Sequence, residues 1–196
     1  MKLIIVNRKR LGVMVIIIGL MMILVAFERN FDEKLKFATL IQNNISSLKK
    51  YEALDNKLSY KLPADWIVKE QKFHGNEILY HNNFNTKDSK IYGFIECWNI
   101  KKDLKAFLEE SKKISNEQNI LYTEYKLSPI NINNRDGYLV NYTILTSYNI
   151  SYKGYEYFLR SDNKFFRFAF FVKQDNFKEN MPTIFRTIVQ TLNYKE

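Results

Sequence analysis

The chain has 196 residues, a net charge of +9 and a single cysteine, Cys97. One cysteine excludes an internal disulfide and any zinc site built on several cysteines. An excess of basic residues would ordinarily favour nucleic-acid binding, but four of the nine net charges lie within the first ten residues, and residues 1–27 contain no acid. We therefore attribute much of the charge to a membrane segment and predict no nucleic-acid partner.

An apolar run over residues 11–27 follows directly on Arg8, Lys9 and Arg10 and contains no charged residue. At about 1.5 Å per residue, a helix of this length reaches about 25 Å, near the lower limit for a bilayer core of about 30 Å. In lipid the backbone polar groups must bond within the segment, which predicts one transmembrane helix. The preceding basic residues predict a cytoplasmic N-terminus and place the remainder outside the cytoplasm, as a single-pass protein of the cell membrane.

A cleaved signal peptide is the alternative to this uncleaved signal anchor. Its apolar stretch is usually only about 7–15 residues long. A cut after Ala26 would also put Leu24 at a position that needs a small side chain. We favour the anchor, and the sequence leaves open whether the segment is cleaved.

Four parts follow from these patterns. A basic cytoplasmic stub (residues 1–10) precedes the transmembrane helix (11–27). A juxtamembrane helix or linker is predicted over residues 28–56, because apolar residues recur at steps of three and four between charged ones. The period then changes to that of strands, which predicts an extracytoplasmic domain over residues 57–196.

Strands and two helices alternate along this domain. The pattern predicts a hairpin of strands 66–73 and 77–84 around Gly75 and Asn76, with a further strand at 90–100. Helical spacing over residues 103–118 puts these side chains on one face: Leu104, Phe107, Leu108, Ser111 and Ile114. Later segments are strands at 120–127, 138–150, 152–160 and 164–173, a turn at 134–137 whose Gly137 supplies positive φ, and a closing amphipathic helix at 182–194.

This order predicts an α+β fold, a mainly antiparallel β-sheet packed with two or more helices. A short strand ending in the Leu62-Pro63-Ala64-Asp65-Trp66 turn, a mid-chain helix, a long meander and a closing helix together resemble the PsbP fold. The resemblance covers residues 57–196. Extrinsic photosystem II proteins and many membrane-anchored or lipid-anchored bacterial envelope proteins share that fold. The resemblance implies no photosystem role and assigns no functional residue.

Two kinds of residue are candidates for chemistry. His74 and His81 flank the predicted hairpin turn and can face each other for a metal or acid–base role, but two surface histidines are the simpler interpretation. Cys97 lies in a predicted strand and would need an activating base to act as a nucleophile, so we interpret it as buried and inert. Glu109 and Glu110 are neighbours on a helix and point apart, which excludes a glycosidase pair.

Tyrosines and lysines suggest binding rather than catalysis. Six tyrosines are dense enough to form a binding surface, although core packing explains most of them: Tyr138, Tyr142, Tyr148, Tyr152, Tyr155 and Tyr157. Three lysine pairs can meet anionic headgroups or simply be solvated: Lys49-Lys50, Lys101-Lys102 and Lys112-Lys113. Common serine hydrolase and nucleotide-binding motifs are absent from the sequence.

We therefore predict a non-catalytic, membrane-anchored, extracytoplasmic binding or assembly module of the cell envelope, with a protein partner. No catalytic, cofactor-binding or metal-binding residue is predicted. The alternatives are a receptor for a small ligand in an aromatic-lined pocket and an envelope enzyme with an unrecognised site. The sequence specifies neither the partner nor the ligand, the oligomeric state nor the physiological process.

The topology can be tested with reporter fusions. A reporter that is active only in the cytoplasm should be inactive when fused after Glu196, because the basic residues before the apolar run hold the N-terminus in the cytoplasm. The same reporter fused before residue 8 is the control and should be active. Activity at both positions would contradict the predicted orientation.

Overall fold

The computed structural model describes residues 17, 18, 21, 45, 47–99, 102–118 and 120–195. Contacts divide the chain into residues 1–43 and residues 44–196. Of the predicted transmembrane segment, only Ile17, Ile18 and Met21 are described, and all three are helical. Among the described residues, no helix is long and apolar enough to cross a membrane. The predicted stub and most of the linker lie outside the described residues.

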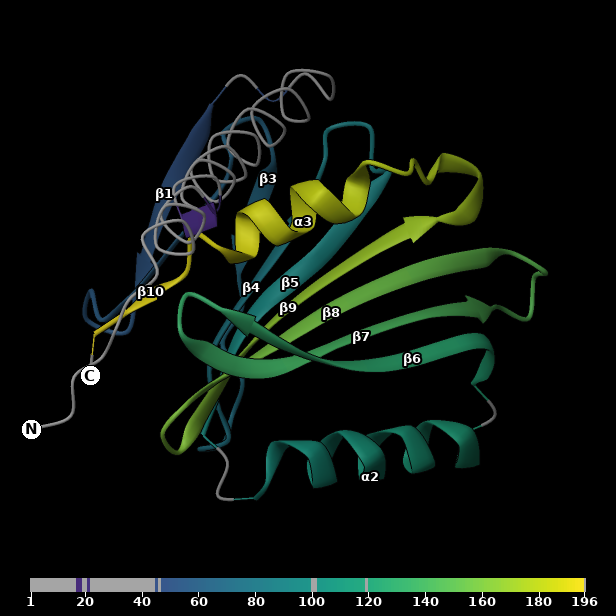
Figure 1. Cartoon of the computed structure of the whole chain (residues 1–196). Helices are drawn as coiled ribbons and strands as arrows, with labels where there is room; N and C mark the ends of the chain where they lie inside the picture. The colour runs from purple at the N-terminus through teal and green to yellow at the C-terminus, as the bar shows by residue number, and fades with distance from the viewer. Residues whose placement is uncertain are drawn as a thin grey trace, which may run out of the picture. The chain divides into compact units, whose positions relative to one another are not determined.

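The second unit is built mainly from strands (Figure 1). The strands are β1 (Leu48–Ala53), β2 (Leu58–Pro63), β3 (Ile67–Glu70), β4 (Ile78–Asn85), β5 (Ile91–Asn99), β6 (Leu121–Ile132), β7 (Arg135–Leu145), β8 (Ser151–Ser161), β9 (Lys164–Lys173) and β10 (Asn193–Tyr194). The helical elements are α2 (Leu104–Glu117), α3 (Met181–Val189) and the 3₁₀ turn η1 (Gln174–Asn176).

Two antiparallel sheets organise these strands. The larger has seven strands in the order β3-β4-β5-β9-β8-β7-β6, and the smaller has three in the order β1-β2-β10. Every paired strand runs antiparallel to its neighbour. The predicted α+β class with a mainly antiparallel sheet is therefore confirmed, and so is the predicted hairpin of β3 and β4.

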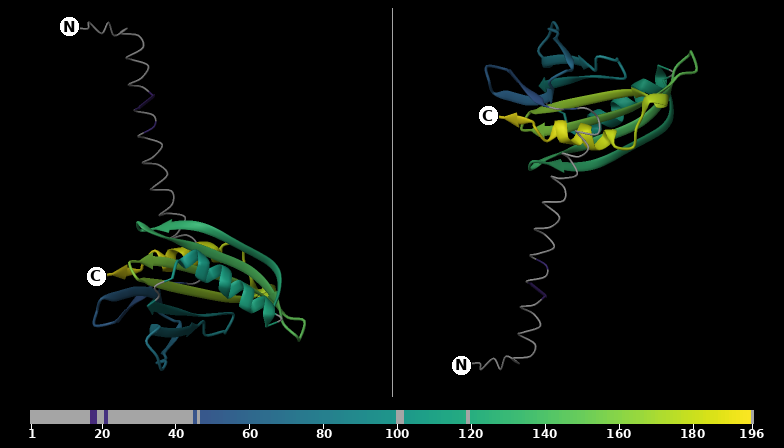
Figure 2. Two further views of the ribbon diagram at one scale, coloured as in Figure 1. Left: turned by 90° about the horizontal axis from the view of Figure 1, so that it is seen from below. Right: turned by 90° about the horizontal axis from the view of Figure 1, so that it is seen from above.

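Helices α2 and α3 cover opposite faces of the larger sheet. Phe165 of β9 packs against the α2 side chains Leu104 and Leu108. Phe170 of the same strand stacks on Phe185 of α3, with ring centroids 4.4 Å apart. Because side chains an odd number of positions apart on a strand point to opposite faces, the two helices lie on opposite sides. In Figure 2, α2 lies in front of the strands in the left view and α3 lies in front of them in the right view.

The predicted juxtamembrane helix or linker is wrong at its C-terminal end. Residues 48–53 form β1, which pairs with β2 so that Tyr51 lies opposite Tyr60. Their rings stack with centroids 5.7 Å apart. Helical spacing in this stretch is overridden by a partner strand, because local periodicity is weaker than tertiary pairing. The domain therefore begins before Lys57, and a fragment starting there would lack a strand of the smaller sheet.

The predicted turn at residues 134–137 is shifted. The chain reverses at Asn133 and Asn134, whose φ angles of 52° and 62° fit a two-residue hairpin turn. Gly137 lies within β7, where a Cβ would come 1.9 Å from the carbonyl oxygen of Phe158. A close approach of two strands therefore requires this glycine, and the turn does not.

The closing helix is shorter than predicted. Its apolar stripe is buried as expected, from Ile184 to Leu192, but α3 ends at Val189. Residues 193–194 instead form β10, which pairs with β2. The last residues thus complete the smaller sheet, a long-range pairing that helical periodicity does not reveal.

Burial of Phe185 predicts a strong effect on stability. Phe185→Ala should lower the free energy of unfolding by about 3–5 kcal/mol, because it empties a fully enclosed site that includes the stacked ring of Phe170. Arg186→Ala, on the exposed side of the same helix, is the matched control and should change little. Chemical denaturation of the two variants compares them. An unchanged unfolding midpoint for Phe185→Ala would show that this stripe is not part of the core.

Candidate functional site

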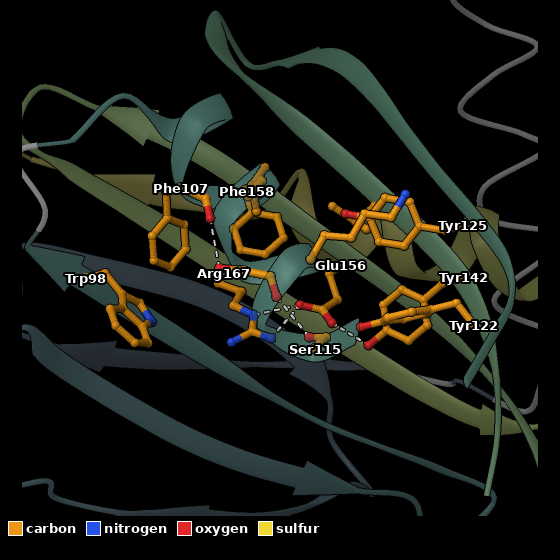
Figure 3. Close-up of a pocket in the computed structure, with 13 residues that line it drawn as sticks. Trp98, Phe107, Ser115, Tyr122, Tyr125, Tyr142, Glu156, Phe158 and Arg167 are labelled. Carbon is orange, nitrogen blue, oxygen red and sulfur yellow. Dashed lines mark hydrogen bonds and ion pairs between the residues drawn. The ribbon is translucent and has the colours of Figure 1, made fainter. Parts of the chain in front are cut away.

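A cavity of about 280 Å³ lies between α2 and the larger sheet (Figure 3). Helix α2 lines it with Phe107, Leu108, Ser111, Lys112 and Ser115. The sheet contributes Trp98, Tyr122, Tyr125, Val140, Tyr142, Glu156, Phe158 and Arg167. Six of the thirteen residues are aromatic, and the charged side chains come from both sides.

Helix α2 is packed along its first half and polar along its second. Asp103 caps it by accepting hydrogen bonds from the backbone N–H of Lys105 and Ala106, at 3.0 and 3.1 Å. Leu104 and Leu108 are buried against the sheet. Beyond them the side chains that face the sheet are small serines, which leave the space that becomes the cavity.

Ser111 and Ser115 bond back to their own helix. Ser111 Oγ donates to the carbonyl of Phe107 at 2.8 Å, and Ser115 Oγ donates to the carbonyl of Ser111 at 2.9 Å. Each hydroxyl uses its single hydrogen in this bond, so its oxygen can only accept a hydrogen bond from a ligand in the cavity.

Three tyrosines, Tyr122, Tyr125 and Tyr142, form one wall that we call the tyrosine wall. Tyr122 is nearly perpendicular to both of the others, with centroid distances of 5.4 Å, and Tyr125 is nearly parallel to Tyr142 at 6.4 Å. Residues three apart on a regular strand face opposite ways. A bulge between Tyr122 and Glu124 shifts the β6–β7 register and brings both β6 tyrosines to the cavity side.

Gly154 makes room for the ring of Tyr142. It lies opposite Tyr142 on β8, and a Cβ there would come 2.4 Å from two ring carbons. A glycine inside a strand often marks such a close approach. Gly154 therefore positions Tyr142 without contributing a side chain.

A charged group spans the floor of the cavity and the neighbouring strands. Arg167 Nε donates to Glu156 Oε2 at 2.7 Å, and its Nη1 donates to Glu96 Oε2 at 3.3 Å. Tyr142 donates its hydroxyl proton to Glu156 Oε1 at 2.5 Å. Both carboxylates are buried, whereas 26% of the Arg167 side chain is exposed. We call Glu96, Arg167 and Glu156 the charged triad.

Burial and neighbouring charge set the protonation states of this floor. Burial alone would disfavour the Arg167 charge, but Glu156 and Glu96 outweigh it and raise the pKa of Arg167 above its ordinary value. Burial, reinforced by the Glu156 charge, raises the pKa of Tyr142, and burial raises that of Tyr125 to about 12. Both phenols are therefore neutral at physiological pH.

The interpretation of two surface histidines is wrong for His81. His74 is exposed, but His81 is only 7% exposed. Its Nδ1 lies 2.8 Å from Glu96 Oε1, and its Nε2 lies 3.0 Å from Asn83 Oδ1. His81 thus extends the charged triad to β4, and it does not pair with His74.

The described residues offer neither a cluster of metal ligands nor an activated thiol. Across residues 47–99, 102–118 and 120–195, no three His, Cys, Asp or Glu side chains are placed to hold a metal ion. Cys97 is fully buried, as predicted, and burial raises its pKa to about 12. A thiol held neutral at physiological pH is a poor nucleophile.

The predicted tyrosine cluster is divided by the structure. Tyr157 is buried, Tyr142 lines the cavity, and Tyr148 is 86% exposed in a turn. Core packing therefore does not account for Tyr148. Of the lysine pairs, Lys112 has its ammonium 4.0 Å from the centroid of the Tyr125 ring.

Sequence reasoning missed most of the site. It did not single out Tyr122, Tyr125 or any member of the charged triad. One signal was present, because each triad residue interrupts an otherwise apolar strand, as in Ile95-Glu96-Cys97 and Phe166-Arg167-Phe168. A charged residue at a buried position is more informative than an apolar one, since it must be paired.

No family model and no curated protein matches the sequence. Among solved structures, the chain is similar to cyanobacterial PsbP (CyanoP) from Synechocystis sp. PCC 6803. The TM-score is 0.58 at 13% identity, over 77% of this chain and 94% of that one. The chain has the PsbP-like fold.

A second likeness supports the same architecture. A protein from Bacteroides thetaiotaomicron VPI-5482 matches with a TM-score of 0.52 and 15% identity, over 76% of this chain and 48% of that one. At these identities the likeness concerns the fold alone. The function of this PsbP-like domain must therefore be inferred from its own residues.

Removing the guanidinium of the charged triad should lower the free energy of unfolding. Arg167→Met leaves two buried carboxylates without their guanidinium, and breaking a buried pair in this way typically costs about 3–5 kcal/mol of stability. Arg160→Met is the matched control, because Arg160 pairs with Asp103 at the surface and is 48% exposed, and such pairs contribute about 0–1 kcal/mol. Equal unfolding midpoints for the two variants would contradict the role given to Arg167.

Proposed function

We propose that this protein is a non-catalytic, membrane-anchored binding module whose site is the cavity beneath α2. The supporting observation is the combination of six aromatic side chains with a floor of mutually paired charged groups in one concave site. Mostly apolar concavities with a few convergent polar groups are where proteins bind small molecules. At about 280 Å³ the cavity is just below the usual range of about 300–1,000 Å³, so its ligand is small.

The proposed location rests on the sequence. Basic residues precede the apolar run of residues 11–27, and this order favours an anchor with the PsbP-like domain outside the cytoplasm. A binding domain held at the cell surface would meet its ligand in the envelope or the medium.

Binding is favoured over catalysis by how the polar groups are used. Glu156 accepts from both Tyr142 and Arg167, and Cys97 does not line the cavity. A general base must instead have a proton acceptor free within reach of the substrate. Groups that are already paired with one another orient a ligand rather than transfer protons.

Docking of an envelope protein is the second candidate function. The sheet face that carries the triad also bears ring-to-ring contacts of Phe94, Phe171, Tyr92 and Tyr152. Tyr92 is 42% exposed. Aromatic residues are enriched in protein interfaces, and this surface is the part of the domain that would contact such a partner.

Plugging the cavity tests the proposed site. Ser111→Phe should fill the cavity, and Lys113→Phe should place the same ring on the exposed side of α2. Saturation-transfer NMR with a panel of small cationic, neutral and anionic amphiphiles should find compounds that bind the wild type and Lys113→Phe but not Ser111→Phe. Thermal melts check that both variants remain folded. Binding that survives Ser111→Phe, or a panel without any binder, would contradict the proposal.

A further inference from the structure

The position of the Lys112 side chain shows that the tyrosine wall attracts a cation. The ammonium of Lys112 lies over the face of Tyr125, 4.0 Å from the ring centroid. Within the described residues, no carboxylate lies within ion-pair distance of Lys112, although Lys105 and Lys102 on either side of the helix start do pair with glutamates. A cation over a tyrosine face is attracted by the negative face of the ring. Lys112 therefore occupies a position suited to a positive charge.

Four side chains that line the cavity present acceptor oxygens to it: Ser111, Ser115, Tyr142 and Glu156. The hydroxyls of Ser111 and Ser115 donate hydrogen bonds to helix carbonyls, and the Tyr142 hydroxyl donates one to Glu156, so these three oxygens can only accept from a ligand. The Glu156 carboxylate lies beside the Tyr142 oxygen, adds two further acceptor oxygens to the cavity floor, and is paired with Arg167. Acceptor oxygens, a carboxylate and aromatic faces all stabilise a positively charged ligand, and none of them stabilises an anion.

The positive charge of Arg167 does not reverse the preference of the cavity for a cation over an anion. Its Nε, Nη1 and Nη2 atoms all contact carboxylates. The rings of Phe94 and Phe158 also contact it, with centroids 4.7 and 5.4 Å from the guanidinium carbon. An anion approaching the remaining N–H groups would meet Glu96 and Glu156 at close range, and like charges so placed repel.

Resting on the proposed binding role of the cavity, we infer that its ligand is a small organic cation, an ammonium group with apolar substituents such as a quaternary amine. The tyrosine wall contacts the substituents, and Glu156 balances the charge. Lys112 is the internal competitor for this position. Its flexible stem lets the ammonium move into solvent when a ligand enters.

Three probes of nearly the same shape separate charge from size: choline, its neutral isostere 3,3-dimethylbutan-1-ol, and the anion 3,3-dimethylbutanoate. The full chain is kept in a maltoside detergent, which has no choline headgroup. Isothermal titration should show choline binding about tenfold tighter than the neutral isostere, with no binding of the anion. The plugged variant Ser111→Phe should bind none of the three.

Lys112→Met gives the sharper test. This change keeps the apolar stem and removes the ammonium, so choline affinity should rise at least threefold while affinity for the neutral isostere stays the same. Lys113→Met is the matched control, because Lys113 is exposed and does not line the cavity, and its choline affinity should equal that of the wild type. Weaker choline binding in Lys112→Met would show that Lys112 is a ligand contact and would overturn the role given to it.

The remaining outcomes distinguish the two proposals. If the neutral isostere or the anion binds at least as tightly as choline, and Ser111→Phe abolishes that binding, the cavity is a binding site but its ligand is not a cation. If no isostere binds to the wild type or to Lys112→Met, the cation inference is overturned, and the amphiphile panel decides separately whether the cavity binds anything.

Discussion

The pairing of Arg167 with two buried glutamates constrains the whole domain. Glu96 lies directly opposite Arg167 in the β5–β9 register, and Glu156 lies diagonally from it across the β8–β9 pair. A slip of one residue in either pair would turn a carboxylate to the opposite face, where Phe170 and Phe185 pack without a cation. Because an unpaired buried carboxylate costs several kcal/mol, the triad fixes both the register of the three central strands and the face that receives α2.

The sequence predicts an element well when the element's own residues determine its structure, and poorly when a partner strand does. Strand β9 and helix α2 agree with their predicted bounds to within a residue, because each carries a long apolar stripe with the period of its own element. Strands β1 and β10 were predicted as helix instead. Each is held by pairing with β2, which directly follows β1 but lies far from β10 in the sequence. In a short segment held by its partner strand, the local pattern need not show the period of a strand.

The candidate site was less predictable for a geometric reason. A spacing of three between Tyr122 and Tyr125 places them on opposite faces of a regular strand, and only the bulge reverses this. A bulge is a local irregularity of pairing, so it depends on how β7 is aligned rather than on the β6 sequence alone. The charged triad was within reach of sequence reasoning, since Glu96, Glu156 and Arg167 each interrupt an apolar strand, and buried charges need partners.

The two faces of the sheet have different physical tasks. On the α3 face, large apolar rings such as Phe168, Phe170 and Phe185 are fully buried, and dense packing of this kind supplies most of the stability. On the α2 face, burial is confined to the first half of the helix, and the second half covers serines, tyrosine hydroxyls and charge. A helix anchored at one end and loosely packed at the other can adjust over a ligand without disturbing the core, because local stability need not be uniform across a domain. This division explains how the domain can keep a polar cavity on one side of its larger sheet. Packing on the α3 face holds the strands in place, and the α2 face can carry the residues that bind.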